Sequence, residues 1–170
     1  MKNPITAVCA TLCLICGCTT HPPLETAARV DLGRYAGKWY DVAHFPQFFL
    51  RGCTATTAEY TLRADGKVDV VNRCRKQTPS GQERSARAVA RSVNPPRNTQ
   101  LKVRFGLFEG SYWIIDLDEQ YRWALVGSPD RRSLWILSRT VPMDPAAYER
   151  LVDTARERGF DVSRLEKTVH

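Results

Sequence analysis

Short runs rich in β-branched and aromatic residues alternate with clusters of turn residues from position 37 onward. Gly, Pro, Asn and Asp mark the ends of these runs because they adopt the backbone conformations that turns require. The pattern predicts eight strands, near residues 37–45, 54–63, 67–74, 83–93, 100–105, 112–117, 123–127 and 133–138. Eight strands at close and fairly even spacing indicate an all-β sandwich or barrel.

The hydrophobic period changes after the last predicted strand. Four apolar residues then recur at helical spacing: Tyr148, Leu151, Val152 and Ala155. Asp144 suits the N-cap, Pro145 the first turn, and Gly159 the position just past the end. We therefore predict one C-terminal α-helix whose apolar stripe packs on the outside of the sheet. The tail over 162–169 is expected to be extended and to pair with an open sheet edge.

The N-terminal residues have the pattern of an export signal. Lys2 precedes an apolar run over 5–15 that is too short to cross a bilayer. ICGC, at 15–18, resembles a bacterial lipobox, in which cleavage precedes the Cys that carries the lipid. An ordinary cleaved signal is the alternative.

The lipobox resemblance implies a division of the chain. We expect a lipoprotein signal peptide over 1–17, a lipidated Cys18 with its tether over 18–32, and one domain over 33–170. Thr19, rather than an Asp, follows the Cys. In Gram-negative lipoproteins this choice is typical of sorting to the outer membrane.

Cys53 and Cys74 remain as an even pair in an oxidising compartment, which favours a disulfide. A hairpin turn near 65–66 would, however, set Cys74 opposite Thr56 rather than Cys53. A bridge requires the two Cα atoms to lie within about 7 Å. A bulge, or a bend before Thr54, would close the gap.

The formal net charge of the chain is +7, and the basic residues are spread along the whole sequence. This charge indicates either a solvated basic surface or attraction to anionic lipid headgroups or acidic ligands. An exported protein seldom meets nucleic acid, so no nucleic-acid partner is predicted. The three histidines lie far apart in the sequence, at 21, 44 and 170, and indicate no catalytic group, metal site or cofactor.

Two sequence stretches together resemble a known family. GKWY, at 37–40, resembles the Gly-x-Trp signature of lipocalins, and DEQYRWALVGSPDRRSLWILSR, at 118–139, resembles their second and third motifs. The later stretch, with one helix and ERGFDVS after it, is similar to bacterial outer-membrane lipocalins close to apolipoprotein D. The resemblance covers about residues 33–168. It implies an eight-stranded antiparallel up-and-down lipocalin barrel with one C-terminal α-helix packed outside.

The same resemblance implies structural roles for the motif residues. In lipocalins the Trp of the first motif fills the closed end of the barrel, and the Arg of the last motif lies across its face. These roles fall to Trp39 and Arg139, with Tyr121 in the turn of the second motif. Gly37 is expected where another backbone passes close. A guanidinium over an indole contributes about 0.5–1 kcal/mol when exposed, and more when desolvated.

Strand alternation and the resemblance also predict which side chains face the interior. If Arg139 faces inward at the closed end, alternate residues before it share its face. Similarity to apolipoprotein D places aromatic residues of two earlier strands inside. The five predicted ligand contacts are Phe105, Tyr112, Ile114, Trp135 and Leu137. Packing of a filled barrel is the alternative for each, and the direction of Trp123 stays open.

The loop HFPQFFLRG, at 44–52, is unusually apolar and is expected near the open mouth. Its apolar residues are Phe45, Phe48, Phe49 and Leu50. They either fold over the barrel or form a contact patch for a membrane or for a second copy of the chain, a homodimer. Arg51 is a candidate contact for an anionic headgroup.

These observations favour a binding module over an enzyme. An eight-stranded barrel can hold one small ligand, so we expect storage or transport of a fatty acid, lysophospholipid or similar lipid. We expect the lipid anchor to attach the protein to the bacterial outer membrane, with the barrel facing the periplasm. A ligand-free structural barrel is one alternative. A thiol-dependent lipid isomerase is another, and it would require Cys53 or Cys74 to be unpaired.

Overall fold

The computed structural model describes residues 21–170, so the expected signal peptide and Cys18 lie outside the described residues. The strands, in chain order, are β1 (Gly37–His44), β2 (Cys53–Leu62), β3 (Val68–Lys76), β4 (Glu83–Ser92), β5 (Gln100–Phe105), β6 (Phe108–Leu117), β7 (Trp123–Gly127), β8 (Leu134–Ser138) and β9 (Glu166–Lys167). The helical elements are α1 (Leu32–Tyr35), η1 (Phe48–Leu50), α2 (Pro145–Glu157) and η2 (Val162–Arg164).

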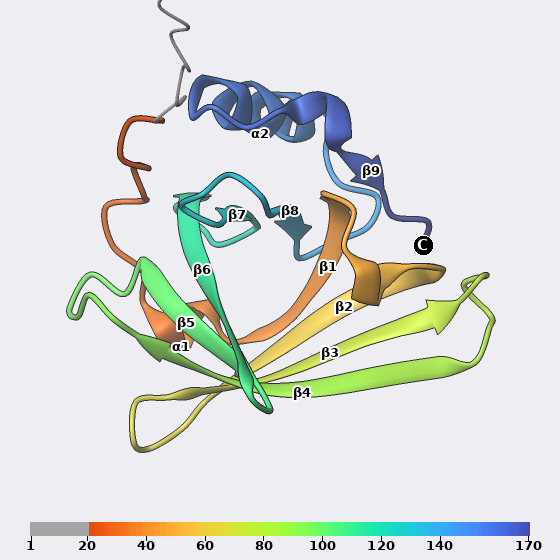
Figure 1. Cartoon of the computed structure of the whole chain (residues 1–170), viewed down its shortest axis with the longest axis horizontal. Coiled ribbons are helices and arrows are strands. Elements are labelled where there is room, and N and C mark those ends of the chain that lie inside the picture. The colour runs from red at the N-terminus through yellow and green to blue at the C-terminus, as the bar shows by residue number, and fades with distance from the viewer. Residues whose placement is uncertain (1–20) are drawn as a thin grey trace, which may run out of the picture.

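All eight predicted strands are present. The largest difference is in β6, which begins at Phe108 rather than Tyr112 because it pairs with β5 up to the tight turn between them. Each strand pairs antiparallel with the next, and β1 pairs with both β8 and β2. The sheet therefore closes into an up-and-down barrel rather than a sandwich (Figure 1).

Antiparallel neighbours place successive connections at alternate ends of the barrel. The loops after β2, β4, β6 and β8 lie at one end with α1, and we call this the closed end. The loops after β1, β3, β5 and β7 lie at the other, the open end. Every loop is thereby assigned to one end.

The C-terminal tail completes the barrel wall near the open end. β1 pairs with β2 only from Gly37 to Tyr40. Beyond that point β9 pairs with β1, and the Ala55 N–H donates to the Val169 carbonyl at 2.6 Å. The tail thus bridges the gap between β1 and β2, which confirms the predicted edge pairing. The extended conformation predicted over 162–169 is wrong for Val162–Arg164, which form η2.

Helix α2 packs against the outside of the barrel, as predicted (Figure 1). The Asp144 carboxylate accepts a hydrogen bond from the Ala147 N–H at 3.0 Å and caps the first turn. Gly159 has a φ of +84° just past the helix end, where L residues are strained. The helix buries Leu151 and Ala155 against the barrel.

Alternation along the strands divides the buried apolar residues into two clusters. The inner cluster lies inside the barrel and consists of Val30, Tyr35, Trp39, Tyr60, Val68, Val70, Ala88, Ala90, Leu101, Val103, Ile114, Ala124, Val126 and Leu137. The outer cluster lies between the barrel and α2 and consists of Leu24, Ala43, Phe45, Ile115, Leu125, Leu134, Ile136, Met143, Leu151, Ala155 and Phe160.

The segment before α1, which belongs to the tether expected over 18–32, is packed against the barrel. Leu24 and Val30 are buried. The Ala27 N–H donates to the Ile114 carbonyl at 3.0 Å, and the Val30 N–H donates to the Arg97 carbonyl at 2.8 Å. The packed part of the chain therefore begins near Leu24. Within residues 21–170, none of the helices has the length and apolar character needed to cross a membrane.

Candidate functional site

Trp39 and Arg139 meet at the closed end of the barrel. The Trp39 side chain is fully buried, and the Arg139 guanidinium carbon lies 3.9 Å from the centre of its ring. The guanidinium also donates five hydrogen bonds, of 2.8–3.3 Å, to the carbonyls of Arg34, Tyr35, Ala36, Lys38 and Tyr121. The indole N–H of Trp39 donates to the Tyr35 carbonyl at 2.8 Å. Arg139 thus ties α1 and β1 to the indole at this end.

A glycine is needed at position 37 for a different reason from the one predicted. Its φ is +93°, and a Cβ added there would lie 3.3 Å from Nη1 of Arg139. The expectation of a passing backbone is therefore wrong, because the close neighbour is the guanidinium. Tyr121 also acts at this end, since its hydroxyl accepts a hydrogen bond from the Asp31 N–H at 2.9 Å. The Arg34 guanidinium lies 4.2 Å from the centre of the Tyr121 ring.

The five residues predicted as ligand contacts occupy inward-facing positions. Ile114 and Leu137 belong to the inner cluster, and Tyr112 and Trp135 pack against it. Phe105 follows Leu101 and Val103 at alternate positions of β5, and both of those residues belong to the inner cluster.

Exposure of these side chains rises toward the open end. Ile114 is 0% exposed, whereas Tyr112 and Trp135 are partly exposed and Phe105 is 36% exposed. An inward side chain can meet solvent only where the interior is open to it. Near the closed end, the inward side chains are therefore buried, and we call this part of the interior the lower half of the barrel. Near the open end the inward side chains meet solvent, and we call this part the upper half. Trp123, whose direction was undecided, faces outward under Arg150, with 4.0 Å between guanidinium carbon and ring centre.

A group of three tyrosines lies inside the barrel above Trp39. The Tyr112 hydroxyl oxygen lies 2.7 Å from that of Tyr35 and 2.9 Å from that of Tyr60. Only Tyr112 was predicted. Tyr60 could have been found by alternation along β2, whereas Tyr35 sits on α1, where alternation does not apply. We call this group the tyrosine cluster.

Burial keeps the tyrosine cluster neutral. It raises the pKa of Tyr60 to about 12, and it raises the pKa values of Tyr35 and Tyr112 well above their usual range. Three neutral hydroxyls carry three protons, but two hydroxyl contacts use only two of them. One proton is left that can be donated to a polar atom of a ligand in the upper half of the barrel.

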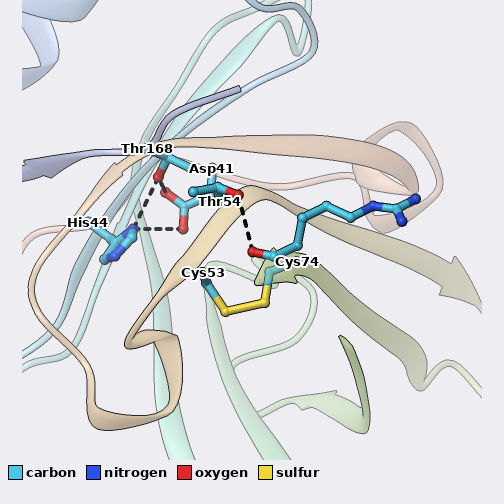
Figure 2. Close-up of a disulfide and its surroundings, with 7 residues drawn as sticks. Asp41, His44, Cys53, Thr54, Cys74 and Thr168 are labelled. Atoms are coloured by element: carbon cyan, nitrogen blue, oxygen red, sulfur yellow. Dashed lines mark hydrogen bonds and ion pairs between the residues drawn. A yellow bond between two sulfur atoms is a disulfide. The ribbon is translucent and has the colours of Figure 1, made fainter. Parts of the chain in front are cut away.

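Asp41 and His44 form a buried pair where the tail crosses β1 (Figure 2). His44 Nδ1 lies 2.9 Å from Asp41 Oδ2, and Thr168 Oγ1 lies 3.3 Å from the same nitrogen. Burial lowers the pKa of His44. The hydrogen bond to Asp41 and the charges of Asp41 and Glu166 raise it, and together they outweigh the effect of burial, so the pKa of His44 is raised overall. The pair fastens the tail to the barrel wall.

This pair does not have the geometry of a hydrolase triad. A general base of that kind uses one ring nitrogen for the nucleophile and the other for the carboxylate. Here Thr168 and Asp41 both face Nδ1 of His44. Within residues 21–170, three or more His, Cys, Asp or Glu side chains are nowhere grouped so that they could hold a metal ion.

Cys53 and Cys74 are joined by a disulfide, with Cα atoms 5.4 Å apart (Figure 2). A bulge in β2 makes this possible. Thr57 pairs with Arg73, but Thr54 pairs with Arg75, so the register shifts by one residue between them. A bulge was one of the two irregularities, with a bend before Thr54, that could close the gap; Cys53 itself pairs with Lys76, two residues from Cys74. Because both sulfurs are bonded, neither thiol is available for the isomerase alternative.

The apolar loop after β1 divides between two environments. Phe45 is buried in the outer cluster, 6.2 Å from Phe160 between ring centres, so it does not reach the mouth. Phe48 is 81% exposed and Phe49 is 48% exposed. Folding over the barrel is therefore excluded for Phe48. Leu107, in the turn after β5, and Phe108, the first residue of β6, lie at the same end, and both are highly exposed.

The barrel can now be compared with known proteins. The family described as Lipocalin-like domain matches residues 30–170. The chain belongs to the lipocalin family, which confirms the resemblance of its motifs.

Individual relatives share most of the chain length. The chain is 38% identical over 155 residues to outer membrane lipoprotein Blc of Vibrio cholerae, covering 89% of this chain and 90% of the relative. It is 24% identical over 155 residues to apolipoprotein D of Bos taurus, covering 87% and 80%. The solved structure of apocrustacyanin C2 matches with a TM-score of 0.67 at 17% identity, covering 87% and 90%, and shows the shared fold.

Proposed function

We propose that this lipocalin binds one hydrophobic or amphiphilic ligand, such as a fatty acid or a lysophospholipid, for storage or transport at the bacterial cell envelope. The observation that carries the proposal is that the upper half of the barrel is open to solvent. Its inward side chains Trp135, Tyr112 and Phe105 meet solvent while those below them are buried. An acyl chain there would gain about 0.8 kcal/mol for each methylene removed from water.

The apolar side chains of the barrel interior and the tyrosine cluster would bind different parts of the ligand. Trp135, Ile114 and Leu137 offer apolar surface to an acyl chain. The unused proton of the tyrosine cluster offers one hydrogen bond to an ester or carboxyl oxygen. Binding of this kind needs no cofactor, no metal and no catalytic step. Arg51, which is exposed within the loop after β1, is a candidate contact for an anionic headgroup.

The location is proposed from the relatives and from the lipobox. Similarity to an outer membrane lipoprotein supports attachment to the outer membrane. We propose that Cys18 carries the lipid and that the barrel faces the periplasm. The exposed Phe48 and Phe49 then serve as a contact patch for membrane or for a second copy of the chain.

Tryptophan fluorescence tests the ligand site directly. The processed chain, residues 18–170 with Cys18→Ser to prevent lipidation, is titrated with lysophosphatidylcholine below its micelle concentration. We expect a saturable change that is lost in Trp135→Phe and kept in Trp123→Phe. Trp123 is the matched control because it lies on the outer face of the adjacent strand.

Two results would contradict the proposal. One is the absence of a saturable change in the unsubstituted protein, which would favour a filled structural barrel. The other is equal loss of the signal in both tryptophan variants, which would place the lipid outside the barrel.

A further inference from the structure

A groove of about 580 Å³ runs along the outside of the barrel, over β4, β5 and the start of β6. Six basic side chains line it: Arg63, Lys67, Arg87, Arg91, Lys102 and Arg104. Glu109 is the one acidic side chain among its lining residues. We call this feature the basic groove.

Alternation places the basic groove outside the ligand-binding interior. Ala88 and Ala90 of β4 belong to the inner cluster, so Arg87 and Arg91 point outward. Lys102 lies opposite Arg91 across the strand pair, and Arg104 lies two residues further along β5. The sheet therefore holds these side chains side by side at a fixed spacing.

The charge of the basic groove is only partly neutralised. Glu109 lies 3.3 Å from Arg91, and Asp65 lies 3.1 Å from Lys67. Arg87 and Arg104 make no ion pair with any residue between 21 and 170. Like charges held together without counterions create a positive potential that favours anions.

An exposed apolar tip adjoins the basic groove. Gly106 and Glu109, which line the groove, directly flank Leu107 in the turn and Phe108 at the start of β6. Leu107 is 99% exposed and Phe108 is 82% exposed. Protein surfaces that enter the headgroup region of a bilayer typically combine exposed apolar residues with neighbouring basic residues.

We propose that the basic groove and the tip at Leu107 and Phe108 form a docking surface for a bilayer of anionic phospholipids. The arginines hold headgroup phosphates, for which the planar guanidinium is suited. The tip enters the interface between headgroups and acyl chains. The loop with Phe48 lies at the same end of the barrel, so docking would bring the open end toward the membrane. The proposal does not depend on a ligand inside the barrel.

Vesicle co-sedimentation tests the docking surface. The processed chain with Cys18→Ser is mixed with phosphatidylcholine vesicles, with or without phosphatidylglycerol. Each positive charge contributes about a fivefold gain near an anionic surface, so the loss of two of them in Arg87→Glu with Arg104→Glu should weaken binding at least about 25-fold. Leu107→Ser with Phe108→Ser should weaken it several-fold at about the same salt dependence. Added salt should weaken binding by the unsubstituted chain.

Two matched controls isolate the surface. Arg156→Glu with Arg164→Glu makes the same change in net charge at exposed sites outside the basic groove, with Arg156 on α2 across the barrel (Figure 1). Leu62→Ser with Val93→Ser removes apolar side chains that are 41% and 40% exposed at the closed end. Both controls should bind vesicles as the unsubstituted chain does.

Several results would overturn the proposal. Equal binding to both vesicle types would remove the role of charge, and equal weakening by a control and its test variant would remove the role of this surface. Binding to soluble heparin without binding to vesicles would reassign the groove to a soluble polyanion. Unchanged vesicle binding by both test variants would also overturn the proposal, because neither the arginines nor the apolar tip would then contact the bilayer.

Discussion

Replacement of Arg139 by Met tests how the closed end is held. Met keeps much of the side-chain length and its contact with Trp39, but it removes the charge and all five hydrogen bonds to carbonyls. The carbonyls come from α1, from β1 and from the turn before β7. We therefore expect Arg139→Met to loosen α1 from the barrel and to lower the free energy of unfolding.

The magnitude follows from the contacts. A hydrogen bond that involves a charged group contributes about 1.5–3 kcal/mol, and a guanidinium on an indole about 0.5–2 kcal/mol. These contributions do not add, because water reaches the half-buried site and rehydrates several of the carbonyls when the guanidinium is gone. We expect a loss of about 3 kcal/mol for Arg139→Met. Arg139→Lys keeps the charge but cannot serve five carbonyls, so about half of that loss is expected.

Equilibrium urea unfolding, followed by far-ultraviolet circular dichroism with the disulfide intact, measures these changes. Arg132→Met is the matched control, because the Arg132 side chain is 85% exposed, and it should cost less than about 0.5 kcal/mol. A loss below about 1 kcal/mol for Arg139→Met would refute the assigned role. So would equal stability of Arg139→Lys and the unsubstituted protein.

Three further predictions concern stability. Trp39→Ala should cost about 3–5 kcal/mol in the same urea assay, since the ring is fully buried; a cost under about 1 kcal/mol would mean that the ring is not part of the core. Cys53→Ser with Cys74→Ser should cost about 3 kcal/mol, as expected for the loop that the bridge closes; unchanged stability would contradict it. The raised pKa of His44 means that its pairing with Asp41 stabilises fully below about pH 6.5 and is lost as pH rises through the folded-state value. His44→Gln should remove that decline in stability above about pH 6.5, and an identical decline in both proteins would refute the assignment.

The sequence was sufficient for the strands and for the inward positions that were predicted on them. A period of two predicts which side of a strand is buried, and this is why Trp135, Leu137 and Ile114 could be placed inside. Trp123 stayed undecided because both faces of β7 are apolar, one toward the inner cluster and one toward α2. Only the position of the helix resolves that choice.

Features that depend on contacts between distant segments were not predictable. Tyr35 joins the tyrosine cluster from α1, and no period links it to Tyr112. The role of the tail between β1 and β2 depends on where β1 leaves β2 after Tyr40. Leu107 lies in the turn after β5 and Phe108 begins β6 four residues before the predicted start of that strand, so the pattern assigned neither side chain to a face.

Native mass spectrometry of the processed chain, purified gently with its lipids, tests the central claim most directly. The claim is that the upper half of the barrel holds one amphiphile. We predict one bound lipid per chain, which added lysophosphatidylcholine displaces and which is reduced in Trp135→Ala but not in Trp123→Ala. A protein that carries no lipid and takes up none when lysophosphatidylcholine is supplied would contradict the claim.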